Sequence, residues 1–271
     1  MYVPSSTGSA GWFAIHGKVA LVTGASGGIG TAIATELARE GVDVCLTARD
    51  RNKLDAVAGT IAKMSGRSPA VHAGDLHEQD VPAAAVAAAI AAFGQLDIVV
   101  NCAGDTKRGD FLKLSDEDWL GGFALKFHGN VRMTRAAWPL LRQTHGAVVN
   151  IVGVSARVGS AEFAIGGAVN VALMNFTKAM ADLGLRDGVR VNAISPGLIE
   201  TDRLTRNIER LMREHSCSRD EAVSRLLAPR GTKRFGRPEE IGWLAAFLAS
   251  PKAAFIHGAI IDIDGGSTRA L

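Results

Sequence analysis

The chain has 271 residues, with 30 Lys and Arg against 27 Asp and Glu, so its formal net charge is +3. No block of basic residues stands out, so neither a nucleic acid nor a membrane surface is expected as a partner. A hydrophobic content of 47% excludes a disordered chain and is ample for a sizeable core. The chain has one tyrosine, Tyr2, almost at its start, which disfavours any mechanism that needs a tyrosine in the folded core.

The three cysteines are widely spaced and odd in number, which argues against a disulfide framework and favours a reducing compartment. No Cys-x-x-Cys or Cys/His cluster is present, so no metal site is predicted. The chain start lacks the basic and apolar pattern of a signal peptide. The longest apolar segment, Val81–Phe93, is too short to span a bilayer. We therefore expect a cytoplasmic protein.

Residues 1–16 are predicted to form an N-terminal arm, and residues 17–271 one domain in which strands and helices alternate. Short apolar runs indicate strands buried on both faces, and apolar residues at helical spacing indicate helices. The expected strands are 18–22, 42–47, 69–73, 96–101, 147–152, 189–195 and 259–263. The expected helices are 29–39, 52–64, one from 81 with Asp80 as its cap, 115–142 capped by Ser115, 164–185 and 238–249.

This alternation predicts an α/β fold: a single doubly wound, seven-stranded parallel sheet of the Rossmann type, with helices on both faces. Residues 199–235 are more polar, and we expect two short helices there, inserted over the carboxyl edge of the sheet. Such folds bind their ligands at that edge. The arginines of the insertion favour an acidic ligand slightly, but the sequence names no substrate.

A glycine-rich turn joins the first predicted strand to the first predicted helix, in the sequence Thr23-Gly24-Ala25-Ser26-Gly27-Gly28-Ile29-Gly30. Glycines at such a turn let backbone N–H groups approach a pyrophosphate at the helix N-terminus. Because the turn lies between a strand and a helix, it predicts a dinucleotide-binding site.

Together with later motifs, this turn resembles the short-chain dehydrogenase/reductase family. The other motifs are Asn101-Cys102-Ala103-Gly104 after the fourth strand, Pro196-Gly197 after the sixth and Asp264-Gly265-Gly266 after the seventh. The resemblance covers the chain from about residue 16 to the end. It implies an oxidoreductase with a nicotinamide cofactor, assembled as a homodimer or homotetramer through the helices at 115–142 and 164–185.

The resemblance also implies which residues bind the cofactor. Asp75 and Leu76 would hold the adenine. The other implied contacts are Gly24, Ser26, Gly28, Ile29 and Gly30 of the turn, Asn101, Ala103 and Gly104 after the fourth strand, and Pro196, Gly197, Ile199 and Thr201 around the nicotinamide.

The choice of cofactor depends on the end of the second strand. An acidic residue there would bind the ribose 2′-OH of NAD, whereas an arginine suits the 2′-phosphate of NADP. Ala48 stands at the expected acidic position and Arg49 follows it, while Asp50 is expected to cap the next helix. NADP(H) is therefore the preferred cofactor, with NAD(H) as the alternative.

At the positions of the family's catalytic residues, the sequence departs from the family pattern. The family uses an Asn on the long helix, a Ser after the fifth strand and a Tyr-x-x-x-Lys on the next helix. Alignment from the neighbouring motifs places Lys126, Gly153, Gly166 and Asn170 at these four positions. In the family pattern the tyrosine exchanges a proton with the substrate, and the lysine lowers its pKa. That proton donor is missing here.

Two glycines in place of Ser and Tyr are expected to leave a hollow beside Lys126. We hypothesise that Lys126 is a substitute acid or an anion-binding cation, with a pKa lowered by partial burial. Ser155 is a candidate to hydrogen-bond a ligand, and Asn170 to orient one, although an amide cannot act as an acid. The alternative for Lys126 is that it reaches solvent or pairs with a carboxylate. The alternative for Ser155 is that it is a loop residue without a role in binding.

Three functions stay open on the sequence. The first is an NADP(H)-dependent oxidoreductase with a non-standard active site, because Pro196, Gly197 and Thr201 preserve the nicotinamide end. The alternative is a non-catalytic dinucleotide-binding protein, a sensor or a partner subunit, which explains the missing chemical groups. The third is a non-redox enzyme, such as a lyase, that uses the pocket.

Overall fold

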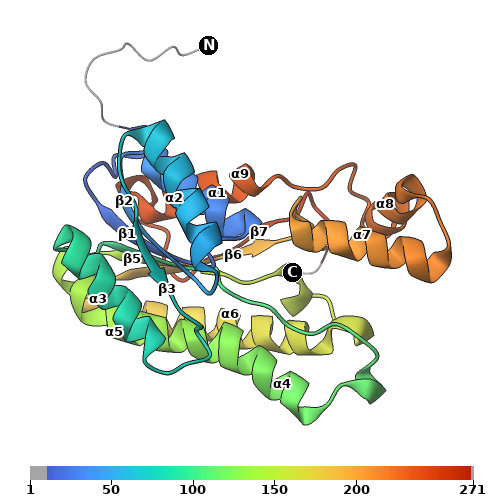
Figure 1. The fold of residues 1–271 in the computed structure, drawn as a ribbon. Coiled ribbons are helices and arrows are strands. Elements are labelled where there is room, and N and C mark those ends of the chain that lie inside the picture. Colours follow the sequence, from blue (N-terminus) through green and yellow to red (C-terminus); the bar gives the residue numbers. More distant parts are fainter. Residues whose placement is uncertain (1–10, 270–271) are drawn as a thin grey trace.

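The computed structural model describes residues 11–269, in which seven strands form one parallel sheet with the order β3-β2-β1-β4-β5-β6-β7 (Figure 1). The predicted Rossmann-type sheet is therefore confirmed. The strand order reverses between β1 and β4, and such a switch point is where open α/β sheets bind ligands. The strands are β1 (Val19–Thr23), β2 (Asp43–Ala48), β3 (Ala70–Ala73), β4 (Ile98–Asn101), β5 (Ala147–Ile151), β6 (Arg190–Pro196) and β7 (Ile260–Ile263).

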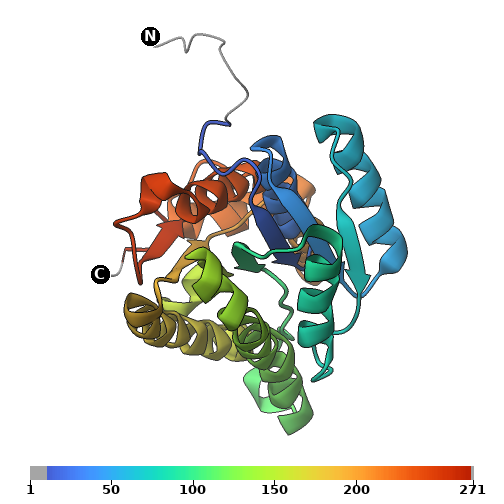
Figure 2. The ribbon, with the colours of Figure 1, turned by 90° about the vertical axis from the view of Figure 1, so that its left-hand side faces the viewer.

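Helices cover both faces of the sheet, as Figures 1 and 2 show from two directions. One face carries α1 (Gly28–Arg39), α2 (Arg51–Ser65) and α9 (Pro238–Ala249). The other face carries α3 (Val81–Phe93), α5 (Gly129–Thr144) and α6 (Ala164–Asp187). None of the helices within residues 11–269 is long and apolar enough to cross a membrane.

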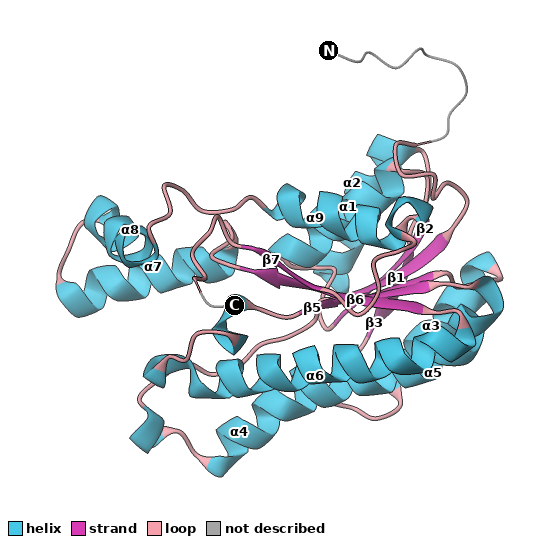
Figure 3. Cartoon of the chain, turned by 180° about the vertical axis from the view of Figure 1, so that it is seen from behind, coloured by secondary structure: helices cyan, strands magenta, loops and turns pink. Residues whose placement is uncertain are grey.

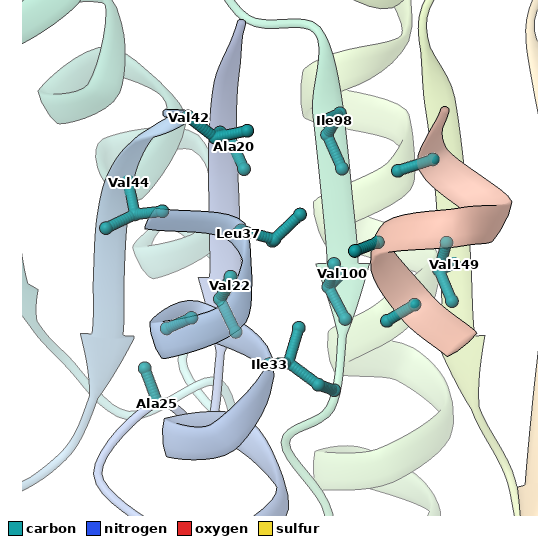
Figure 4. Close-up of a cluster of buried hydrophobic side chains, with 14 of the residues drawn as sticks. Ala20, Val22, Ala25, Ile33, Leu37, Val42, Val44, Ile98, Val100 and Val149 are labelled. Carbon is teal, nitrogen blue, oxygen red and sulfur yellow. The ribbon is translucent and has the colours of Figure 1, made fainter. Parts of the chain in front are cut away.

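The core on the α1 face shows why the strands are apolar throughout. In Figure 4, Ile33 and Leu37 of α1 lie over Val22 of β1 and Val100 of β4, and all four side chains are fully buried. Burying each such side chain stabilises the fold by about 1.5–3 kcal/mol. A second cluster on the opposite face includes Leu21 of β1, so successive residues of this strand face opposite helix layers.

The long helix predicted at 115–142 is interrupted. Ser115 caps α4 (Asp116–Gly122) as expected, with its hydroxyl accepting from the Asp118 backbone. A π-helical segment, η2 (Phe123–His128), then separates α4 from α5. Gly122 lets α4 approach α6 closely, since a Cβ there would lie 2.6 Å from Cγ2 of Ile165. Single π-helical turns occur frequently at functional sites, and this one contains Lys126.

The two predicted aspartate caps differ in outcome. Asp50 accepts a 3.1 Å hydrogen bond from the Lys53 backbone N–H and caps α2, as predicted. The prediction that Asp80 caps α3 is wrong, because its side chain makes no capping bond. Its backbone is already helical (φ −89°, ψ −24°), whereas a capping side chain requires an extended backbone.

Part of the predicted N-terminal arm packs on the domain. Ile15 is 1% exposed, and the Phe13 ring lies 6.3 Å from that of Phe247 in α9. The Phe13 backbone N–H also donates to the Glu40 carboxylate at 2.7 Å. Residues 1–10 of the predicted arm lie outside the described residues, so the extent of the arm stays a prediction.

The polar stretch after β6 forms two helices, as expected from its sequence. These are α7 (Asp202–His215) and α8 (Arg219–Leu227), and Figure 3 shows them extending from the sheet on the same side as α4. Their apolar residues form a small cluster of their own, which includes Leu204, Ile208 and Leu226. The shorter helical turns are η1 (Phe111–Lys113), η3 (Val154–Ala156), η4 (Ala161–Phe163), η5 (Ala228–Arg230) and η6 (Pro251–Ala253).

Candidate functional site

A cavity of about 1550 Å³ lies at the carboxyl ends of the strands. Its wall includes the glycine-rich turn, residues that follow β2, β4, β5 and β6, and one face of α7. It also includes all but two of the residues predicted from the sequence: Gly24, Ser26, Gly28, Ile29, Gly30, Arg49, Leu76, Ala103, Gly104, Lys126, Ser155, Asn170, Pro196, Gly197, Ile199 and Thr201. Their individual roles stay predictions.

The glycine-rich turn is pressed against the chain that follows β4. Gly24 has a left-handed backbone (φ +65°), and a Cβ there would lie 2.9 Å from Cα of Ala103. The Thr23 hydroxyl accepts 2.9 Å hydrogen bonds from the backbone N–H groups of Cys102 and Ala103. These contacts hold the two segments together at the switch point of the sheet.

The N-terminus of α1 opens on this cavity without a side-chain cap. Its N-cap residue is Gly27, which has no side chain to accept from the first helical N–H groups. Unpaired N–H groups and the helix dipole together favour an anion there. The local structure therefore fits the pyrophosphate of a dinucleotide. Thr201 adjoins this turn, since a Cβ on Gly28 would lie 2.5 Å from its Cγ2.

Cationic side chains line the cavity wall after β2. Arg49 follows Ala48 at the end of β2, and Lys53 lies one turn into α2. Asp50 also lines this wall, but its carboxylate is engaged in capping α2. The arrangement suits the phosphate of an NADP ribose better than the hydroxyl of an NAD ribose.

Two predicted cofactor residues do not line the cavity. Asn101 is fully buried, and its amide nitrogen donates to Asn150 at 2.9 Å and to Thr134 at 3.1 Å. Asp75 accepts from the His77 ring at 2.7 Å, and the contacts with His77 contribute to lowering the pKa of its carboxyl. Asn101 therefore links the strands below the site, while Leu76 beside Asp75 does reach the cavity wall.

Lys126, Asn170 and Ser155 form a hydrogen-bonded chain inside the cavity. The Lys126 ammonium donates to Oδ1 of Asn170 at 2.6 Å and to the Val152 carbonyl at 3.3 Å. The Asn170 amide donates in turn to Oγ of Ser155 at 2.8 Å. The lysine stem packs on Gly104, where a Cβ would lie 2.7 Å from its Cδ. These contacts hold the three side chains, predicted separately, in one network.

The hollow predicted beside Lys126 is open at Gly153, which lines the cavity together with Lys126, but it is filled at Gly166. The Phe163 ring covers Gly166, so that any Cβ at this position would overlap the ring. Beside Gly153, a Cβ would lie 3.0 Å from the amide nitrogen of Asn170. The expectation of a hollow is therefore wrong for Gly166, because Phe163 occupies that space, whereas Gly153 lies on the cavity wall beside the Asn170 amide.

The surroundings of Lys126 lower its pKa from 10.5 to about 8. Burial is the largest cause, because it penalises the charged form, and the positive charge of Arg203 is the second. Cys102 and Asp105 act in the opposite direction, and burial raises the pKa of the Cys102 thiol to about 12. At neutral pH Lys126 is therefore mainly an ammonium that can release its proton.

Three residues that line the cavity were not predicted individually from the sequence: Arg108, Phe163 and Arg203. Arg108 lies with its guanidinium carbon 4.4 Å from the centre of the Phe163 ring, and that of Arg203 lies 5.8 Å from it. A sequence signal exists for Arg203, since Arg203, Arg206 and Arg210 follow a helical spacing. No comparable signal marks Phe163. Within the described part of the chain, no cluster of side chains is suited to hold a metal ion.

Comparisons with known proteins agree with this fold. A family model described as enoyl-(acyl carrier protein) reductase matches residues 24–268. An uncharacterized oxidoreductase of Mycobacterium tuberculosis is 36% identical over 94% of both chains, and NADPH-dependent reductase BacG of Bacillus subtilis is 32% identical over 94% of this chain and 99% of its own. The crystal structure of L-sorbose reductase from Gluconobacter frateurii, complexed with NADPH and L-sorbose, has a TM-score of 0.91 and 30% identity, over 97% of this chain and 100% of its own.

The fold and the site thus define a dinucleotide-binding protein of the Rossmann type. The chain belongs to the short-chain dehydrogenase/reductase family, and the class of protein that this supports is an oxidoreductase.

Proposed function

We propose that this oxidoreductase uses NADP(H) to reduce a carbonyl group, with Lys126 as the proton donor. The observation that carries the proposal is the position of Lys126, whose ammonium is fixed by Asn170 and Val152 on the wall of the cofactor cavity. The alignment that replaces the family's tyrosine by Gly166 is part of this proposal.

The cofactor assignment is supported by the uncapped N-terminus of α1, by Arg49 directly after β2 and by Lys53 in the first turn of α2. NADPH is also named for the similar L-sorbose reductase structure and for BacG. In this chain the glycine-rich turn would hold the pyrophosphate, and Arg49 the 2′-phosphate. Pro196, Gly197 and Thr201 would enclose the nicotinamide, as the resemblance implies.

The chemistry requires a hydride and a proton. When bound, NADPH supplies the hydride to the carbonyl carbon. The oxygen then needs a proton, which the Lys126 ammonium donates as it becomes a neutral amine, so the product is an alcohol. A general acid works best when its pKa lies near the working pH, and a value of about 8 meets this condition. The Asn170 amide keeps the ammonium oriented.

Titration with NADPH and NADH, followed by a screen of ketones, enones, quinones and imines, tests the proposal. We expect tighter binding of NADPH than of NADH, and NADPH oxidation with at least one carbonyl substrate. Binding without turnover across the panel would contradict the oxidoreductase and favour a non-catalytic dinucleotide-binding protein. Failure to bind either cofactor would contradict both functions.

A further inference from the structure

Five arginines line the cavity on the side of α7: Arg108, Arg203, Arg206, Arg210 and Arg230. We call them the arginine cluster. They come from the loop after β4, from α7 and from η5, so three separate segments converge. Arg108 and Arg210 both lie within 4.0 Å of the Glu162 carboxylate, and Arg108 and Arg203 both lie over the Phe163 ring, so these cations are close to one another. Burial, together with the positive charges of Arg210, Arg203 and Arg230, lowers the pKa of Arg108. Positive charges gathered in this way are stabilised by an anion between them.

Carboxylates already lie among these cations: Glu214 pairs with Arg210 at 2.5 Å, Asp105 pairs with Arg203, and Glu162 lies between Arg108 and Arg210. Glu162 places Oε2 4.0 Å from Arg108 and 3.7 Å from Arg210, and its side chain is 63% exposed. The loop that bears it is fixed by a 2.9 Å hydrogen bond from the Gly109 N–H to the Glu162 carbonyl. Exposed ion pairs at such distances contribute little, so another anion can replace this carboxylate at small cost.

Phe163 lies between the arginine cluster and the part of the cavity that contains Lys126. Arg108 and Arg203 both stack against its ring, which itself covers Gly166 on α6. Arg203 is close enough to Lys126 for its charge to lower the lysine pKa. Asp105, the ion-pair partner of Arg203 at 3.4 Å, is 72% exposed and offers only weak neutralisation.

We propose that the substrate is a carbonyl compound that carries a carboxylate or phosphate group, bound by the arginine cluster where the Glu162 carboxylate now lies. Guanidinium groups bind such oxyanions through paired hydrogen bonds, which fix orientation as well as supplying charge. Held there, the substrate presents its carbonyl oxygen toward Lys126. This inference rests on the proposed function for the reaction, whereas the anion site itself can be tested by binding alone.

The test uses the protein with bound NADP⁺, which cannot reduce a ketone, and measures ligand affinity by calorimetry. Acetoacetate is compared with methyl acetoacetate, and acetonylphosphonate with its dimethyl ester, so that carboxylate and phosphate recognition are separated. The variants are Arg210→Gln and Glu162→Gln. Arg213→Gln is the matched control, because Arg213 lies on the same helix, is exposed and does not line the cavity.

We expect one of the two anions to bind at least about tenfold more tightly than its ester, a difference of about 1.4 kcal/mol. Arg210→Gln should bring that ratio close to one. Glu162→Gln should raise it about threefold by removing the competing carboxylate that lies between Arg108 and Arg210, and Arg213→Gln should leave it unchanged. Equal affinities for both anions and their esters in the wild-type protein would overturn the inference. An equal decrease of the anion-to-ester affinity ratio in Arg210→Gln and Arg213→Gln would also overturn it.

Failure of the proposed function has a different signature. It would appear as absence of NADPH binding or of turnover, and the same titrations on the cofactor-free protein would still compare anion with ester.

Discussion

The Lys126 ammonium lies 2.6 Å from the Asn170 side-chain oxygen, across the gap between η2 and α6. In the alignment on which the proposed function rests, these are the positions of the family's asparagine and lysine, so the two residue types would be exchanged. The cation and the amide meet on the wall of the cavity. The Asn170 amide also donates to Ser155, and the Phe163 ring covers Gly166 on the same helix.

The pH dependence of the reaction should report the pKa of Lys126. Its ammonium form is the proton donor, and its pKa is lowered to about 8. Carbonyl reduction should therefore be fastest below about pH 8 and fall about tenfold for each further pH unit. Steady-state rates of NADPH oxidation between pH 6 and 10 measure this decrease at high pH, which we call the alkaline limb of the pH–rate profile. A flat profile across that range would contradict the assignment of Lys126 as the proton donor.

Two substitutions of Asn170 should shift the alkaline limb of the pH–rate profile in opposite directions. Asn170→Asp places a carboxylate beside the ammonium, which favours the charged form and raises the lysine pKa. Asn170→Leu removes the hydrogen-bond acceptor and desolvates the ammonium, which lowers it. The limb should shift to higher pH in the first variant and to lower pH in the second. A shift in the same direction in both variants would show that Asn170 does not act on Lys126.

Arg49 should determine the preference for NADPH. Arg49→Ala removes the cation expected to meet the 2′-phosphate, so the Kd for NADPH should rise about tenfold or more while that for NADH changes little. Arg51→Ala is the control, since Arg51 pairs with Asp55 and does not line the cavity. Cofactor fluorescence titrations measure both constants. An equal loss for the two cofactors would argue against recognition of the 2′-phosphate by Arg49.

Arg190 should be important for stability rather than for activity. Its guanidinium donates to the carbonyls of Leu248, Ala249, Ser250 and Ala253, and so completes the C-terminal end of α9. Arg190→Met should lower the free energy of unfolding by about 2–4 kcal/mol, because it leaves these carbonyls without their charged partner. Urea unfolding measures this loss, with the exposed Arg186→Met as the control. Equal stabilities of the two variants would contradict this role.

The strand and helix pattern could be predicted from the sequence because each element has a strong local signal. Apolar runs mark the strands, and the glycine-rich turn marks the entry to α1. The π-helical segment at Phe123–His128 has no comparable signal in the sequence, and it directly follows Gly122, where α4 and α6 approach closely. The role of Asp80 was misjudged for a similar reason, because a suitable residue type does not guarantee the backbone that capping requires.

The candidate site was predictable residue by residue but not in its contacts. Lys126, Ser155 and Asn170 were identified separately, and only the structure shows that they form one hydrogen-bonded chain. The hollow inferred from Gly153 and Gly166 is wrong at the second glycine, because the Phe163 ring covers it, whereas Gly153 lines the cavity. A glycine in a sequence shows that a side chain is absent, but it does not show what fills the space.

The central claim is tested most directly by the single-turnover rate of NADPH oxidation in Lys126→Met, with the carbonyl substrate that the wild-type protein reduces fastest. Lys107→Met is the control, because Lys107 is paired with Asp118 and does not line the cavity. Loss of the general acid should reduce the rate by about 10²–10⁴-fold in Lys126→Met, with the Kd for NADPH nearly unchanged and the control at the wild-type rate. A wild-type rate in Lys126→Met would contradict the claim that this lysine supplies the proton.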